Sequence, residues 1–231
     1  MGSLIFILIV VYVALFLIKN KLVIRFDTLF RKGFKKHKDN YGVYCFCGKQ
    51  GVGKTYSVAD FLSEIIKPEQ KVITNVKSLA KSNPDTYIYK KDFKDIQAMV
   101  DELGESVNKR NKYIIFFDEI FTLVEKGKLD KSMLAWLSQM RKKGIIFITT
   151  AQEWLEINVT FRRYVRYQVQ CEMFNIPFFD TALSYNTIKN AYEMKWDKDE
   201  NEYVCPVIKS TLKKCSKAIA DSYDTFEVIE S

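Results

Sequence analysis

The feature that most constrains the fold of this chain is a glycine-rich segment, Gly48–Thr55, which reads GKQGVGKT. It fits the phosphate-binding loop pattern G-x-x-x-x-G-K-[ST] at every position. A β-branched and aromatic run, Gly42–Cys47, comes before it, and residues with helical spacing, Tyr56–Ile66, follow before Pro68. Strand, loop and helix in this order predict a nucleotide-binding α/β domain.

Each position of this loop has a chemical reason. Glycines allow backbone angles that direct successive N–H groups at phosphate oxygens, and the helix N-terminus adds its dipole. We expect Lys54 to reach the β- and γ-phosphates of ATP, and Thr55 to offer its hydroxyl to Mg²⁺. ATP and Mg²⁺ are therefore the predicted cofactors. The predicted nucleotide-binding residues are Gly48, Lys49, Gln50, Gly51, Val52, Gly53, Lys54, Thr55 and Tyr56.

A second segment predicts the acidic half of the site. Ile114–Phe117 is a run of four large apolar residues that ends in Asp118 and Glu119. Such a run is typical of a buried strand, and ligands of open α/β sheets bind at the carboxyl ends of the strands. We expect Asp118 to hold Mg²⁺ and Glu119 to orient and deprotonate the attacking water. An ordinary strand end with a capping acid is the alternative.

A third buried strand, Ile145–Ile148, ends in polar residues that could contact the γ-phosphate. Gln152 is the first candidate for this role and Thr150 the second, and a polar strand cap is the alternative. Transition-state charge also needs a basic group, which a neighbouring subunit can supply as an arginine finger. Arg162 and Arg163 are preferred for that role over Arg141 and Arg166, although each could be an ordinary surface residue.

The N-terminus carries a different signal. Residues 1–18 have no charged side chain, and Leu4–Ile18 is apolar throughout. Eighteen helical residues span roughly 27 Å, close to the ~30 Å of a hydrocarbon core. A membrane anchor is preferred over a buried core helix or a signal peptide, because no positive charge comes before the run. The anchor would be single-pass.

The positive charge of the chain is concentrated just after this run. Residues 19–38 carry eight Lys and Arg against one Asp, out of a net charge of +8, so the remaining chain is nearly neutral. The positive-inside rule therefore places the N-terminus outside and the ATPase domain in the cytoplasm, of the host cell if the protein is viral. Aromatic residues among these charges fit a stretch that lies on anionic lipid, with a solvated linker as the alternative.

Composition excludes several other classes. Hydrophobic residues make up 48% and charged residues 28%, which excludes disorder for most of the chain. The single His, His37, argues against most His-based catalysis and His metal sites. Five Cys without zinc-ligand spacing indicate reduced thiols rather than a disulfide framework.

The pattern along the chain predicts an α/β P-loop NTPase with a mostly parallel sheet flanked by helices. A β-rich C-terminal extension would follow, and one N-terminal transmembrane helix would precede it. The expected strands are 42–47, 71–76, 113–118 and 144–150; the expected helices are 55–66, 92–103 and 129–141, with a strand or loop at 86–90 and a turn or short helix at 153–163. Antiparallel strands are expected at 164–174, 184–194 and 202–208, before a weakly helical end.

These elements divide the chain into four expected parts. They are a transmembrane anchor at 1–18, a basic juxtamembrane neck at 19–39, an ATPase core at 40–170 and the C-terminal extension at 171–231.

The residues from Tyr41 to Gln170 resemble the zonular occludens toxin-like (Zot-like) ATPases of filamentous-phage assembly, within the FtsK–HerA group of P-loop DNA motors. The segments that carry the resemblance are GKQGVGKT, VITNV, IIFFDEI, LSQMRKKGIIFITTAQ and NVTFRRYVR. The resemblance implies ATP hydrolysis by a homo-oligomeric ring, expected to be a hexamer, that acts on DNA, often single-stranded, at a membrane. In phage assembly proteins of this kind the span usually follows the ATPase, whereas here the apolar run precedes it.

The leading hypothesis is a membrane-anchored ATPase motor that drives phage or plasmid DNA export, virion assembly or packaging, with phage coat or assembly proteins as further partners. One alternative is an ATP-dependent remodelling switch or chaperone for a membrane protein complex. A small-molecule kinase is a third, less favoured hypothesis, since it needs an acceptor pocket and no anchor.

Overall fold

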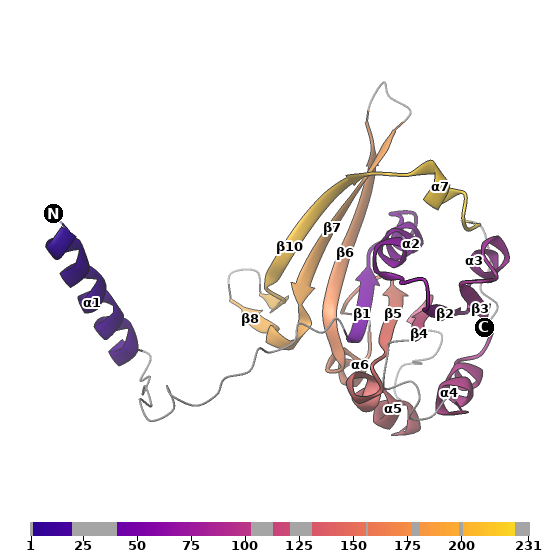
Figure 1. The fold of residues 1–231 in the computed structure, drawn as a ribbon, viewed down its shortest axis with the longest axis horizontal. Helices are drawn as coiled ribbons and strands as arrows, with labels where there is room; N and C mark the ends of the chain where they lie inside the picture. Colours follow the sequence, from indigo (N-terminus) through magenta and orange to yellow (C-terminus); the bar gives the residue numbers. More distant parts are fainter. Residues whose placement is uncertain are drawn as a thin grey trace. The chain divides into compact units, whose positions relative to one another are not determined.

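The structure is a computed structural model that describes residues 2–19, 41–102, 113–120, 131–155, 157–176, 181–198 and 201–224 (Figure 1). The chain divides into two compact units, Met1–Asp39 and Asn40–Ser231.

The first unit contains one helix, α1 (Gly2–Lys19), in which the side chains of residues 5–12 and 15 are exposed. Among the residues that the structure describes, no helix is long and apolar enough to cross a membrane. The predicted basic neck, apart from Lys19, lies outside the described residues.

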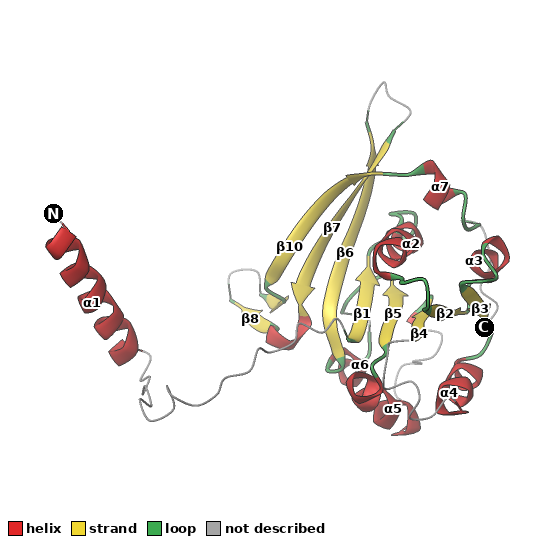
Figure 2. Cartoon of the chain, viewed as in Figure 1, coloured by secondary structure: helices red, strands yellow, loops and turns green. Residues whose placement is uncertain are grey.

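The second unit is built on an eight-stranded sheet with the order β10-β7-β6-β1-β5-β4-β2-β3 (Figures 1 and 2). Six neighbouring strands, from β6 to β3, are parallel. They are β1 (Gly42–Cys47), β2 (Lys71–Thr74), β3 (Tyr87–Tyr89), β4 (Tyr113–Phe117), β5 (Ile146–Ala151) and β6 (Val165–Asn175). The predicted α/β fold with a mostly parallel sheet is therefore confirmed.

Helices cover both faces of this sheet, because alternate residues of each strand point to opposite sides. On one face α2 (Lys54–Ile65) and α3 (Lys77–Ser82) belong to the buried cluster that includes Tyr44 and Phe46 of β1. On the other face α4 (Phe93–Glu102), α5 (Lys131–Lys143) and α6 (Val159–Arg162) belong to the buried cluster that includes Val43 and Cys45. The sequence pattern did not predict α3, and β2 ends two residues before the expected end of that strand.

The parallel sheet continues into an antiparallel part at β6. That strand is parallel to β1 on one side and antiparallel to β7 (Ala182–Asn190) on the other, and β10 (Val207–Lys214) forms the edge. Residues 170 and 171, where the extension was expected to begin, therefore lie within one continuous strand.

The rest of the C-terminal extension consists of short elements. They are the 3-10 helix η4 (Ala191–Glu193), the separate ribbon of β8 (Lys195–Asp197) and β9 (Glu202–Val204), and the helix α7 (Lys217–Ala220). The predicted strands 164–174 and 184–194 are present with bounds that differ by a few residues, whereas the predicted strand 202–208 divides between β9 and β10, which belong to different sheets. The predicted strand 184–194 ends at Asn190, where the side chain of that residue caps η4 by accepting a hydrogen bond from the N–H of Tyr192.

Candidate nucleotide-binding site

The glycine-rich loop follows β1 and continues directly into α2. Gly51 and Gly53 have φ angles of 81° and 76°, in the left-handed region that glycine adopts without strain. Gly53 caps α2, and its carbonyl accepts the N–H of Ser57 at 2.8 Å. The glycines thus turn the chain from the strand into the helix while the N–H groups of the first helical turn point into the loop.

Lys54 is held within this loop. Its ammonium donates hydrogen bonds to the carbonyl oxygens of Gly48, at 2.9 Å, and Lys49, at 3.1 Å. The cation therefore lies against the loop backbone, in the region where the sequence motif expects phosphate oxygens. A flexible side chain held only by carbonyl groups can exchange these contacts for a phosphate.

The structure brings the ends of β1, β4 and β5 together. The hydroxyl of Thr55 donates to Asp118 Oδ2 at 3.3 Å, and the hydroxyl of Thr150 donates to Asp118 Oδ1. Asp118 is buried. Thr55 and Asp118 supply the oxygen donors that could hold Mg²⁺, which typically takes one or two carboxylates and completes its shell with water and phosphate.

Asn75 is a site residue that the sequence analysis missed. It follows β2, and its side-chain amide donates to the backbone carbonyl of Asp118 at 3.2 Å, while its Oδ1 accepts the Asp118 N–H at 2.8 Å. The signal was present, because Thr74-Asn75 ends a strand that neighbours β4 in the parallel sheet.

Glu119 has an unusual backbone. Its φ is 58°, in the left-handed region, which is uncommon for a residue with a side chain. Its N–H donates to Thr150 Oγ1 at 2.8 Å, so the hydroxyl that contacts the Asp118 carboxylate also fixes the peptide of Glu119. The side chain is half-buried at the end of β4.

Both acids have raised pKa values. Burial raises the pKa of Asp118, and hydrogen bonds from Thr150 and Thr55 and the charge of Lys54 offset part of that rise. Burial also raises the pKa of Glu119, and the Asp118 charge adds to it, while Lys54 opposes both. A carboxylate with a raised pKa is a better proton acceptor when it is ionised, which suits the role predicted for Glu119.

The two candidates for contact with the γ-phosphate differ in their surroundings. Thr150 is buried and bonded to Asp118 and Glu119, whereas the side chain of Gln152 is exposed. The backbone carbonyl of Gln152 accepts the Gly48 N–H at 3.1 Å and so lies where the loop begins. The structure therefore places the second choice, Thr150, among the acids.

The candidate arginines lie away from the loop of their own chain. Val165, the first residue of β6, pairs with Val43 near the start of β1, whereas the loop follows the end of β1. The helix α6, with Arg162, therefore lies at the opposite end of the parallel strands, at the bottom of the sheet in Figure 1. Arg163 is exposed just after it, and the side chain of Arg141 is not among those described.

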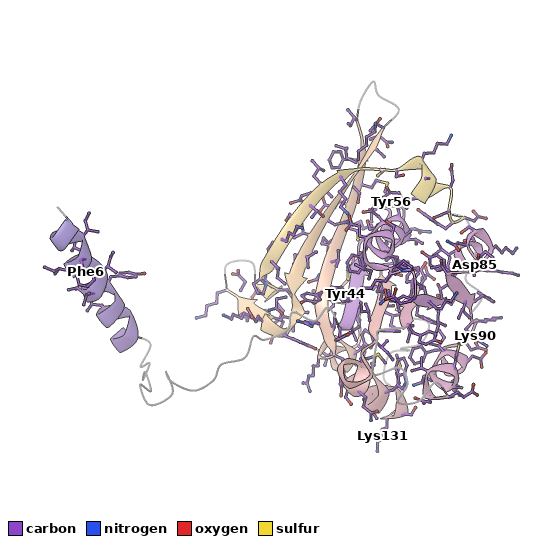
Figure 3. The ribbon with its side chains drawn as sticks, viewed as in Figure 1. Phe6, Tyr44, Tyr56, Asp85, Lys90 and Lys131 are labelled. Carbon is purple, nitrogen blue, oxygen red and sulfur yellow. The ribbon has the colours of Figure 1, made fainter. Side chains whose placement is uncertain are left out.

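Arg162, Arg166 and Tyr56 each contact other parts of the chain rather than the loop. The Arg162 guanidinium lies 5.9 Å from the centre of the Trp154 ring, and its burial lowers its pKa. Arg166 donates to the carbonyl of Tyr41 at 2.8 Å, a structural contact. The hydroxyl of Tyr56, labelled in Figure 3, accepts the N–H of Ser216 at 2.7 Å and so faces the C-terminal extension.

Comparison with known proteins agrees with this geometry. A phosphate-binding loop followed by two buried strands that carry the acid and its polar neighbour defines a P-loop ATPase. Residues 44–174 match the model of the ATPase family associated with various cellular activities (AAA), more than half of the chain. The chain belongs to this family and is an ATP-hydrolysing enzyme. No curated protein matches the sequence.

Several solved structures align with this chain. The N-terminal domain of zonular occludens toxin from Neisseria meningitidis is 18% identical, with a TM-score of 0.46 over 79% of this chain and 98% of that one. The DNA-packaging ATPase B204 from Sulfolobus Turreted Icosahedral Virus is 12% identical, with a TM-score of 0.44 over 71% and 96%. The flagellar accessory protein FlaH from Methanocaldococcus jannaschii is 14% identical, with a TM-score of 0.43 over 74% and 84%.

Proposed function

We propose that this AAA-family ATPase is a membrane-anchored motor that drives phage or plasmid DNA through export, virion assembly or packaging. The observation that carries the proposal is that the hydroxyls of Thr55 and Thr150 both contact the Asp118 carboxylate. Lys54 lies in the adjoining loop, and Glu119 follows Asp118. The action on DNA is supported by the segments that resemble Zot-like ATPases.

The catalytic roles follow from the contacts. Lys54 exchanges its loop carbonyls for the β- and γ-phosphates of ATP. Thr55 and Asp118 hold Mg²⁺, which neutralises phosphate charge when it is bound. Glu119 takes a proton from the attacking water, and Thr150 keeps the Glu119 peptide and the Asp118 carboxylate in a fixed relation. Asn75 holds the other side of the Asp118 backbone.

Assembly into a homo-oligomeric ring would complete this site. Arg162 lies at the opposite end of the parallel strands from the loop, which suits a residue that serves a neighbouring subunit rather than its own. Arg162→Ala protein should then bind ATP but hydrolyse it slowly, and mixing it with Lys54→Ala protein should restore part of the activity. Arg163→Ala provides the parallel test. Activity of a monomer at assay concentration would contradict the ring.

Membrane attachment is proposed from the first nineteen residues. The apolar side chains of residues 5–12 and 15 in α1 are 48–70% exposed, and a lipid environment would cover them. With the positive charge after the helix, the ATPase unit would lie in the cytoplasm. The full chain should resist carbonate extraction, and a C-terminal tag should be protected from external protease in intact cells. Release of the chain by carbonate would contradict the anchor.

The decisive experiment is steady-state ATP hydrolysis by the full chain in mild detergent, with and without single- and double-stranded DNA. Lys54→Ala should lose ATP binding and turnover. Glu119→Gln should keep ATP binding but lose turnover by about 10²–10⁴-fold, the usual effect of a general base. Stimulation by DNA supports the motor. Hydrolysis that DNA leaves unchanged would favour the remodelling ATPase instead.

A further inference from the structure

The helix α2 carries a line of polar contacts to the C-terminal extension. Four of its residues, Tyr56, Ser57, Asp60 and Glu64, hydrogen-bond to residues of the extension. Ser57, Asp60 and Glu64 are three and four residues apart and so lie on one side of the helix, and Tyr56 is next to Ser57 at its start. The helix that begins at the phosphate-binding loop is thus attached to the extension by directional contacts as well as by apolar packing.

One of the two contacts in the first turn of α2, that of Ser57, is buried. The hydroxyl of Ser57 donates to Asn186 Oδ1 at 3.1 Å and lies 3.4 Å from the hydroxyl of Ser184. The amide of Asn186 in turn donates to Ser184 Oγ at 3.2 Å, which closes a three-residue network between α2 and β7. All three side chains are at most 9% exposed. Burial strengthens such hydrogen bonds and makes each unmade one costly, so the network admits few other arrangements.

This network lies directly behind the catalytic end of α2. Ser57 is two residues after Thr55, and its N–H bonds the carbonyl of Gly53, which caps the helix. Any rotation of the first helical turn would change the positions of Lys54 and Thr55 together, because all of them belong to that turn.

The loop is also in close contact with β6, the strand that neighbours β7. A methyl group in place of the Gly48 hydrogen would meet the backbone carbonyl oxygen of Cys171 at 2.8 Å, so the two backbones are in close contact. Adjoining β7 then supplies Ser184 and Asn186. The antiparallel strands therefore form a wall against which the loop and the first turn of α2 are placed.

We propose that Asn186 is a positioning residue for ATP binding and hydrolysis. Through the hydroxyl of Ser57 it fixes the first turn of α2, and thereby the directions of Lys54 and Thr55. The C-terminal extension is then part of the nucleotide site, although its strands carry no residue that the motif requires. The proposal rests on the ATPase activity described above and adds a role for the extension in that activity.

The test is a kinetic comparison of full-length variants. Asn186→Leu and Ser57→Ala should each lower kcat/KM for ATP by about 10-fold to 100-fold, with a rise in KM, because a small misplacement of positioning groups has effects of that size. An unfolded fraction would lower only the apparent kcat, so KM distinguishes positioning from a loss of folded protein. The double variant should be no worse than the more affected single variant, because both changes remove the same contact.

The matched control is Thr187→Ala on the same strand. Its side chain points to the other face of β7, where its hydroxyl contacts Ser210 at 3.2 Å, so kcat and KM should stay within about 2-fold of the unmodified chain. If Asn186→Leu does not fold, Ser57→Ala still tests the positioning role, because Ala is a good helix former and this variant should fold. Unchanged KM in an active, folded Ser57→Ala protein would overturn the positioning role alone. Absence of turnover in the unmodified chain would instead overturn the proposed function.

Discussion

The two faces of the parallel sheet are packed in different ways. On the face covered by α4 and α5, Phe93 meets Phe117, Trp136 and Phe147 edge to face, with ring centres 5.3–5.9 Å apart. On the other face α2 packs its apolar side on the sheet, but its polar residues are bonded to the C-terminal extension.

The hydrogen-bonded face of the sheet is the one whose helix, α2, begins at the phosphate-binding loop. Aromatic rings bury a large apolar area and pack edge to face, whereas buried hydrogen bonds join particular donor and acceptor atoms. The helix that carries Lys54 and Thr55 is held by the directional kind of contact. We conclude that apolar packing holds both faces of the sheet, and that the face with α2 adds directional contacts near the loop.

The largest expected effect comes from breaking the aromatic face. Phe147 is fully buried, and Phe147→Ala should lower the free energy of unfolding by about 3–5 kcal/mol, through lost burial and a cavity. Phe174→Ala is the matched control, because that ring is 48% exposed; its loss should stay below about 1 kcal/mol. Urea unfolding measures both. Equal losses would show that the aromatic cluster is not the stabilising centre.

Close contact between the loop and β6 gives the second prediction. In Gly48→Ala the new methyl group would lie 2.8 Å from the Cys171 carbonyl oxygen. Because the backbone of a strand moves little, the free energy of unfolding of the variant should fall by up to about 3 kcal/mol, and the variant should bind ATP more weakly. Gly51→Ala provides the control: no atom lies within 4 Å of its methyl position, and only backbone strain of about 1 kcal/mol remains. Urea unfolding and ATP titration compare the two, and a smaller loss in Gly48→Ala would contradict the contact.

Much of the fold could be predicted from the sequence because the phosphate-binding loop fixes its own surroundings. A loop of this kind requires a strand before it and a helix after it, and the apolar runs that end in Asp118 and Thr150 indicated two further buried strands. The alternation of strands and helices also indicated a mostly parallel sheet, to which β1, β4 and β5 belong.

The contacts between distant residues could not be predicted in this way. The pairing of Asn75 with Asp118, and of Ser57 with Asn186, joins segments that are 43 and 129 residues apart in the sequence. Neither pair has a spacing that reveals its partner, since polar residues at strand ends occur widely as caps. The location of Arg162 likewise depends on the pairing of β6 with β1, which no local pattern specifies.

A pH prediction concerns the charge at the end of β4. Because the pKa of Asp118 is raised by burial in the folded state, its contribution to stability is full below the unfolded pKa of about 3.9 and is lost as pH rises through the folded pKa. At pH 7 the raised pKa of Asp118 therefore lowers the stability of the protein free of Mg²⁺. Asp118→Asn should raise the free energy of unfolding by about 0.5–2 kcal/mol at pH 7.

This gain should shrink as the pH falls toward the unfolded pKa of about 3.9, below which the carboxyl is protonated in the folded and the unfolded chain alike. Urea unfolding at several pH values, with chelator present, measures the difference between the two proteins. A variant that is less stable than the unmodified chain at pH 7 would show that the hydrogen bonds of the carboxylate outweigh its burial. Hydrolysis should be lost in either case, because Asp118 is assigned to Mg²⁺.

The smallest expected effect lies at the far end of α2, where the contacts are more exposed. Lys213 of β10 lies 2.8 Å from Asp60 and also pairs with Glu64, and the Lys213 side chain is 34% exposed. Lys213→Ala should therefore lower the free energy of unfolding by only about 0.2–1 kcal/mol, and less at high salt. Its KM for ATP should not change, because Asp60 and Glu64 lie beyond the helical turn that holds Lys54 and Thr55. A rise in KM as large as that of Asn186→Leu would mean that all the contacts between α2 and the extension act as one unit. The burial of the Ser57–Asn186 contact would then not explain its effect on KM.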